Sequence, residues 1–158
     1  AGFAVYHRGE LIASLLGGWA DRQKTQPWAA DTLVPVYSTT KGIAALVVAS
    51  LVDTLPDGYE TPVAAVWPEF AANGKAEVTI GQALSHQAGL PGFADEIDPD
   101  LWLDPPACAA AIAALAPMWP PGTAHGYHPL TWGYIAGEIA RRISHGTVKH
   151  ESARTATA

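Results

Sequence analysis

The stretch PVYSTTKGIAAL, residues 35–46, places Ser38 and Lys41 directly before an apolar run with helical spacing. Serine is favoured at the start of a helix, where its side-chain oxygen accepts a hydrogen bond from an unpaired backbone N–H. Residues three apart on a helix share a face, so the Lys41 ammonium could also reach the Ser38 hydroxyl. Desolvation lowers the pKa of a lysine in an apolar setting, and such a lysine can take the proton of a serine nucleophile. The tetrad alone allows both a capped helix and a nucleophile with its base, and because it arises easily by chance it favours the cap.

Size and composition indicate a folded chain and give no sign of a nucleic-acid-binding surface. The 158 residues suffice for one domain with a real core, and 49% hydrophobic against 15% charged residues is not a disordered composition. The formal net charge is −6, from nine Lys and Arg against fifteen Asp and Glu. Nucleic-acid binding and binding to anionic membranes both need clustered basic side chains, and the sequence has no such cluster. We therefore expect neither kind of partner.

The single cysteine and the short apolar runs limit where the protein can reside. Cys108 has no partner for an intrachain disulfide, which slightly favours the cytoplasm. The longest apolar runs, 42–52 and 107–116, are too short to span a bilayer. The chain opens with Ala1 and shows no signal peptide, so we expect it to start inside a longer gene product, and its localisation stays open.

The first twenty residues predict a β-hairpin. Strand-forming residues flank Arg8-Gly9, a turn pair, and the polar segment 22–32 reads as a loop. Two strands alone are marginal and need further strands or a covering helix. Because the rest of the chain is mostly helical in pattern, we expect an α+β domain whose remaining strands are missing.

The remaining sequence alternates helical segments with loops. Apolar residues follow helical spacing after Ser38, and Thr79 predicts a cap for a brief second helix. An alanine-rich helix stopped by Pro117 and an amphipathic helix come later. The predicted helices span 38–55, 79–84, 106–116 and 130–144, with an irregular surface loop over 93–106 and a tight loop over 120–129.

Tyr127 and His86 are further candidates for chemistry. Tyr127 lies on a loop just before a helix, and a phenol beside a cationic lysine can be ionised or relay protons. Without context, a half-buried core tyrosine is the simpler interpretation. His86 could be a base or a ligand, but its setting between a short helix and a turn favours a histidine that hydrogen-bonds the backbone and pins the loop.

Metal binding is not indicated. His125 and His128 have a spacing that suits a metal, but no carboxylate or third histidine lies near them in the sequence. We expect no metal and no cofactor. The six tryptophans are most simply anchors of the core and the loops.

Taken together and in order, these stretches resemble the serine β-lactamase and penicillin-binding-protein superfamily, and within it the β-lactamase-like carboxylesterases called family VIII. Residues 32–53 resemble the nucleophile helix, and LSHQAGL, at 84–90, resembles the Leu-Ser-His-x-x-Gly-Leu stretch. Residues 120–144 resemble the tyrosine motif with its following helix. The resemblance runs from Gly2 to Ser144.

The resemblance implies a β-lactamase/DD-peptidase-like fold, in which an antiparallel sheet packs with helices beside a helical region. We expect one truncated domain over residues 1–158. Its hairpin and loop, 1–37, would belong to the sheet region, and 38–145 would hold the nucleophile helix and the helical region. The segment 146–158 does not resemble the family sequence after the tyrosine helix and is expected to be an atypical tail.

The resemblance also implies a chemistry. Ser38 would be the acylated nucleophile, Lys41 its proton partner and Tyr127 the general base or relay, with the Ser38 N–H as half of an oxyanion hole. An ester or amide would acylate Ser38, and water or an alcohol would release the acyl group. We expect a serine carboxylesterase acting on small-molecule esters. The alternatives are a β-lactamase, a D-Ala-D-Ala peptidase or transesterase acting on lactams or peptides, and a non-catalytic binding fragment.

Two departures from the family pattern bear on specificity and activity. Class C β-lactamases have Tyr-x-Asn where this chain has Tyr127-His128-Pro129, and the missing amide favours the esterase. We expect His128 to contact substrate in this motif. The family's C-terminal strands, with a Lys/His/Trp-x-Gly motif and the second oxyanion N–H, have no counterpart in the sequence. We therefore expect a truncated member of the family, and whether it is active alone stays open.

Overall fold

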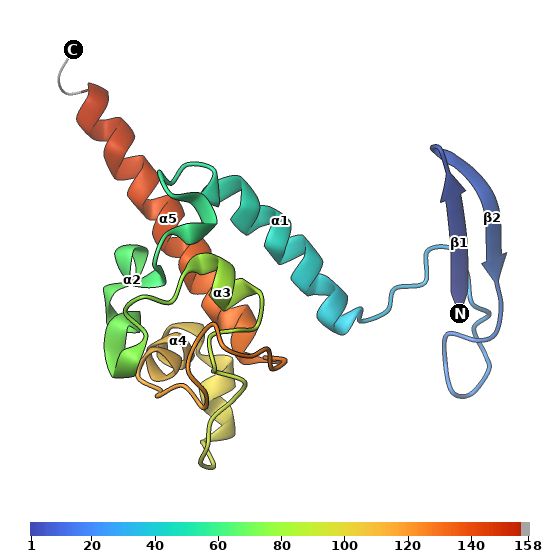
Figure 1. The fold of residues 1–158 in the computed structure, drawn as a ribbon. Coiled ribbons are helices and arrows are strands. Elements are labelled where there is room, and N and C mark those ends of the chain that lie inside the picture. The colour runs from blue at the N-terminus through green and yellow to red at the C-terminus, as the bar shows by residue number, and fades with distance from the viewer. Residues whose placement is uncertain (156–158) are drawn as a thin grey trace. The chain divides into compact units, whose positions relative to one another are not determined.

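The computed structural model describes the backbone of residues 1–155 and the side chains of residues 1–145 (Figure 1). The chain forms two compact units, one of residues 1–37 and one from Ser38 onward. The boundary falls where the sequence predicts the nucleophile helix to begin. That both units belong to a single domain stays a prediction.

The first unit is the predicted hairpin. Strands β1 (Gly2–His7) and β2 (Glu10–Leu16) pair antiparallel around Arg8 and Gly9. Both turn residues have positive φ, 51° and 86°, as a two-residue turn that matches the strand twist requires. None of residues 1–37 is buried. The hairpin therefore has no core of its own, as expected for two isolated strands.

The second unit is built from helices. The α-helices are α1 (Thr40–Val52), α2 (Val63–Val66), α3 (Ile80–Leu84), α4 (Pro105–Ala113) and α5 (Thr131–Thr155). Short 3-10 helices are η1 (Tyr37–Thr39), η2 (Gly58–Glu60), η3 (Pro68–Gly74) and η4 (Pro99–Leu103). No helix of the described chain is both long and apolar enough to cross a membrane.

The start of α3 follows the local sequence closely. The Thr79 hydroxyl accepts a hydrogen bond from the Gln82 N–H, and the Gln82 side-chain carbonyl accepts one from the Thr79 N–H, each at 3.1 Å. This reciprocal pair satisfies two backbone donors that the helix leaves unpaired. The predicted cap and short helix are confirmed.

Several predicted elements differ from the structure in their bounds, including the alanine-rich helix expected over 106–116, which ends at Ala113. The helix expected over 38–55 ends at Val52, before the Pro-containing turn that was expected to stop it. The segment 93–106, expected to be an irregular surface loop, contains η4, and α4 begins within it at Pro105. The Asp104 carboxylate caps α4 by accepting from the Ala107 N–H at 3.0 Å. A proline at the first helical position is compatible with a helix start, so the prolines open a helix here and do not exclude one.

Helix α5 carries the central apolar face of the second unit. It contacts α1, α2, α3 and α4 (Figure 1). Its buried side chains recur at helical spacing, which confirms the predicted amphipathic helix. The helix continues to Thr155, so the segment expected to be an atypical tail is helical that far, and residues 156–158 lie outside the described ones. Among the described side chains of α5, the buried apolar ones are Trp132, Ile135, Ala136, Ile139 and Ile143.

A buried lysine joins η3 to the end of α4. Lys75 is fully buried, and its ammonium donates to the carbonyl of Ala72 at 2.6 Å and to that of Leu115. Asn73 donates from its amide to the Ala114 carbonyl at 2.8 Å. Burial lowers the pKa of Lys75. A cation and an amide thus satisfy the carbonyls of the two residues that directly follow α4.

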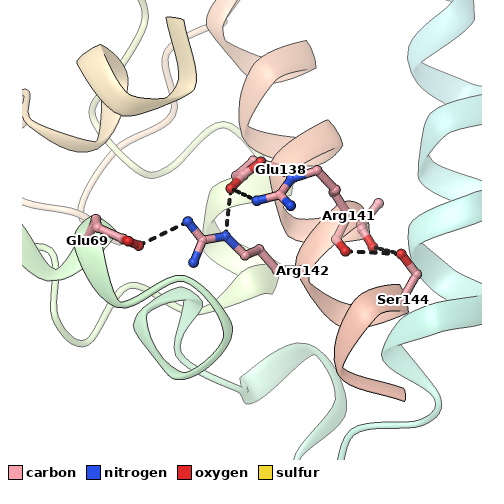
Figure 2. A network of polar contacts seen from close by, with 6 residues as sticks. Glu69, Glu138, Arg141, Arg142 and Ser144 are labelled. Atoms are coloured by element: carbon pink, nitrogen blue, oxygen red, sulfur yellow. Dashed lines mark hydrogen bonds and ion pairs between the residues drawn. The ribbon is translucent and has the colours of Figure 1, made fainter. Parts of the chain in front are cut away.

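A second polar network fastens α5 to η3 (Figure 2). The Glu138 carboxylate lies between two guanidinium groups, 2.7 Å from Arg141 Nη2 and 2.6 Å from Arg142 Nε. Arg142 also pairs with Glu69 at 3.1 Å. Only 11% of the Glu138 side chain is exposed, against 63% for Glu69. The two acidic groups therefore sit in different dielectric surroundings although they share one arginine.

The difference in exposure between Glu138 and Glu69 predicts that their replacement affects stability unequally. Replacing Glu138 with glutamine is expected to lower the free energy of unfolding at neutral pH by about 2 kcal/mol, because charge-assisted hydrogen bonds in a shielded site are lost. Hydrogen bonding from Arg141 is the main cause of the lowered pKa of Glu138. The stabilisation should thus be present at neutral pH and disappear as the pH falls through that lowered pKa. Urea denaturation across this pH range measures it.

Glu69→Gln is the matched control. An exposed ion pair contributes about 0–1 kcal/mol, so this variant should remain near the parent. Equal losses for the two variants would contradict the assignment of the stabilising role to Glu138.

Candidate active site

Three of the predicted residues meet at one oxygen atom. Ser38 lies in η1, directly before α1, and is exposed to solvent. Its Oγ accepts a hydrogen bond from Lys41 Nζ at 3.0 Å and one from the Tyr127 hydroxyl at 2.5 Å. The expected cap is absent, since Thr39, the residue at the N-cap position, makes no side-chain capping bond. The Ser38 oxygen instead faces two groups that can exchange protons with it.

Lys41 is held from a second side by the tyrosine loop. It is half-buried on the first turn of α1, and its Nζ donates to the backbone carbonyl of Pro129 at 2.8 Å. The same nitrogen lies 5.1 Å from the ring centre of Tyr127 and 5.9 Å from that of Trp132. A cation is stabilised by the faces of aromatic rings at such distances. Sequence reasoning missed Pro129, because a backbone carbonyl leaves no trace in residue identity.

Tyr127 occupies the loop between α4 and α5, with its side chain 54% exposed. The hydrogen bond with Ser38, and then Lys41, lower the pKa of the Tyr127 phenol. Hydrogen bonds to the ionised form and a nearby positive charge both favour the phenolate. The simpler interpretation of Tyr127 as a half-buried core residue does not fit the structure, because its hydroxyl lies 2.5 Å from the Ser38 oxygen.

His86 hydrogen-bonds the backbone, as predicted, and the backbone groups that it contacts belong to the tyrosine loop. Its backbone is in the left-handed region with φ 65°. The ring Nδ1 accepts a hydrogen bond from the His128 N–H at 3.1 Å, and the backbone carbonyl of His86 accepts one from the Gly126 N–H at the same distance. Desolvation, and then Lys41 and His125, lower the pKa of His86. The lowered pKa favours the neutral ring, the form in which Nδ1 can accept this bond.

The expected substrate contact of His128 finds no support in the structure. The residue is fully buried, its Nε2 accepts from the Leu90 N–H at 2.9 Å, and its Nδ1 donates to the Gly126 carbonyl at 2.5 Å. Both ring nitrogens are thus used inside the protein. Burial, as the main cause, lowers the pKa of His128 and favours its neutral form. His128 is therefore not assigned to substrate binding.

Gly126 permits the close packing of this loop. A Cβ atom at that position would lie 2.3 Å from the Trp119 ring, which no side chain could accommodate without movement. Trp119 is itself anchored by a hydrogen bond from its ring N–H to the Ala124 carbonyl at 3.1 Å. The glycine before Tyr127 is the signal in the sequence that could have indicated a close approach.

The family model that describes the β-lactamase family matches residues 1–154. The chain belongs to the β-lactamase family. Among curated proteins, it is 40% identical over 141 residues to the esterase/beta-lactamase LipL of Mycobacterium tuberculosis, covering 89% of this chain and 32% of LipL. The chain therefore spans about a third of that relative's length.

Two solved structures superpose closely on this chain. A penicillin-binding-protein homologue from Caulobacter crescentus has 54% identity and a TM-score of 0.84, covering 90% of this chain and 38% of its own. A family VIII carboxylesterase has 46% identity and a TM-score of 0.81, covering 92% and 40% respectively. The predicted β-lactamase-like fold and the predicted family are confirmed, and the chain forms part of an α+β domain of this kind.

Proposed function

We propose that this chain carries the part of a serine hydrolase that holds the nucleophile, and that the hydrolase cleaves carboxylic esters through a covalent acyl-enzyme. The observation that supports the proposal most directly is the convergence of Lys41 Nζ and Tyr127 Oη on Ser38 Oγ, at 3.0 and 2.5 Å. Relatives in the β-lactamase family are named as esterases, which points to the same reaction class. Because the chain spans about a third of its curated relative, the activity is proposed for the complete gene product.

In the acylation step, the Ser38 hydroxyl proton passes to the Tyr127 phenolate as Oγ forms a bond to the ester carbonyl carbon. The carbonyl π electrons move to oxygen, and that charge lies near the start of α1, where the helix dipole and the Ser38 N–H favour an anion. The intermediate collapses, the alkoxide leaves, and it takes the proton from Tyr127. The Lys41 ammonium stabilises the phenolate throughout.

Deacylation repeats these steps with water in place of the serine. Tyr127 takes a proton from water, whose oxygen attacks the acyl carbon, and Ser38 leaves with that proton. An alcohol in place of water would give ester exchange by the same route. Pro129 keeps the lysine in place through its carbonyl during both halves of the reaction.

Labelling with a fluorophosphonate probe tests the proposal. The complete gene product should form a single adduct, and peptide mapping should place it on Ser38. An adduct on another residue, or no adduct on a folded protein, would refute the proposed nucleophile.

Hydrolysis of β-lactams is a second candidate, favoured by the joint name of the relative LipL, esterase/beta-lactamase. The loop holds His128 and Pro129 where class C enzymes have x-Asn, so no side-chain amide follows Tyr127 at that position. We expect turnover of p-nitrophenyl acetate to exceed that of nitrocefin by about tenfold, since a lost hydrogen bond to a substrate amide costs about 1–3 kcal/mol and about 1.4 kcal/mol is a factor of ten. A reversed ratio would favour the lactamase.

A further inference from the structure

We propose that His86 and His128 are positioning residues that hold the Tyr127 loop so that it touches Ser38 and Lys41 at the same time. The inference rests on the proposed function, and it assigns to the two histidines a role that neither substrate contact nor metal binding describes. Neither histidine touches the Ser38 oxygen. Both act through the residues that do.

The position of His128 in the chain is the first argument. It stands between Tyr127, whose hydroxyl reaches Ser38, and Pro129, whose carbonyl reaches Lys41. Both of these residues are joined directly to His128 through the backbone. A shift of His128 would therefore move both contacts of the reactive pair, one through each flanking residue.

The anchoring of His128 is the second argument. Its ring is hydrogen-bonded at both nitrogens, and its backbone N–H is bonded to His86, which makes three hydrogen bonds on one fully buried residue. The tautomer follows from the partners, because the Leu90 N–H can only donate and the Gly126 carbonyl can only accept. Tyr127 has no comparable anchor, since about half of its side chain is exposed. The loop is thus anchored at His128, and this anchor fixes the positions of Tyr127 and Pro129 on either side of it.

His86 holds the loop that carries Tyr127 through contacts on both sides of that residue. It receives hydrogen bonds from Gly126 at its carbonyl and from His128 at its ring, so it grips the loop on both sides of Tyr127. Its ring centre also lies 5.0 Å from that of Tyr127, edge to face, a contact that resists rotation of the phenol. The backbone of His86 is left-handed, with φ 65°, a conformation that non-glycine residues keep only where the surrounding contacts hold it.

A matched pair of variants tests this role in the complete gene product. His86→Gly removes the acceptor and the ring while tolerating φ 65°, and His86→Asn keeps an acceptor near the place of Nδ1 and also tolerates positive φ. The readouts are the second-order rate of fluorophosphonate labelling at Ser38, the kcat and KM for p-nitrophenyl acetate, and the melting temperature.

The expected result separates positioning from general stability. His86→Gly should slow labelling and lower kcat by about tenfold to a hundredfold, with KM within about twofold, because misplacement of reacting groups by about 1 Å has effects of that size. His86→Asn should restore both rates to within about threefold of the parent, since it rebuilds the bond to the His128 N–H.

Each other outcome has a defined meaning. A His86→Gly protein that labels as fast as the parent overturns the positioning role and leaves the proposed function intact. If His86→Gly does not fold, His86→Asn carries the test alone, and a labelling rate below about a tenth of the parent's overturns the inference. Failure of the parent itself to label at Ser38 refutes the proposed function instead.

Discussion

Replacing Ser38 with alanine is expected to lower kcat for p-nitrophenyl acetate by about a thousandfold or more in the complete gene product, as for other serine enzymes that lose their nucleophile. The variant has no oxygen to carry the acyl group, so neither acylation nor the burst of p-nitrophenol that precedes steady turnover can occur. Folding should be unaffected, because Ser38 is exposed and its oxygen caps no helix. Stopped-flow absorbance measures the burst and the steady rate together.

Ser50→Ala is the control for this variant. Ser50 lies on the same helix, and its hydroxyl donates to the Val47 carbonyl at 2.7 Å, away from the tyrosine loop. Its replacement should leave the burst and kcat within about twofold of the parent, since a surface substitution usually changes little. A Ser38→Ala protein that keeps its burst would show that another group is acylated.

The sequence predicted best where local chemistry decides the structure. The Arg8-Gly9 turn, the Thr79 cap and the amphipathic repeat of α5 each depend on residues within a few positions of one another. Such patterns are readable without knowledge of the fold. The order of the family motifs then joined Ser38 to Tyr127, 89 positions apart, which no local pattern could do.

Prediction was weaker where tertiary contacts override local preference. Ser38 was a reasonable helix cap, but its oxygen is occupied by a lysine and a distant phenol. The place of His128 in the tyrosine motif predicts a contact with substrate. Its ring, however, is buried and hydrogen-bonded to backbone groups at both nitrogens. Backbone partners such as the Pro129 carbonyl cannot be inferred from residue type.

The apolar spacing of the first helix shows the same limit. The repeat that begins at Ile43 predicts one buried stripe, but the structure buries Val48 and Val52 while leaving Ile43, Leu46 and Val47 more than half exposed. Periodicity identifies a helix and does not say which part of its apolar surface this portion of the fold covers. Helix α1 contacts α5, the helix that comes after the tyrosine loop, and Val48 and Val52 belong to the same hydrophobic core as the buried residues of α5. The same packing that supports the core therefore brings the two halves of the candidate site together.

Replacing Tyr127 with phenylalanine should lower kcat by about a hundredfold to ten-thousandfold, the range of general acid–base catalysis. The phenyl ring keeps its packing against His86 and the lysine ammonium, so the variant removes only the oxygen at 2.5 Å from Ser38. Fluorophosphonate labelling should slow in parallel, since it also requires proton loss from Ser38. Tyr134→Phe is the control. Tyr134 lies on α5 and its hydroxyl donates to the Trp102 carbonyl, so this variant also loses a phenol oxygen, but one that is bonded to a backbone carbonyl and not to Ser38.

The pH dependence distinguishes a base from a packing group. The pKa of Tyr127 is lowered, so the phenolate forms below the usual value for tyrosine, about 10. Activity should therefore rise with pH as Tyr127 loses its proton, with the inflection of kcat/KM below about 10. Burial raises the pKa of Tyr134. The Tyr134→Phe variant should therefore keep the inflection of the parent. If Tyr127→Phe keeps the rising limb of the parent, the base must be another group, and Lys41, the other group in contact with the Ser38 oxygen, becomes the one to replace.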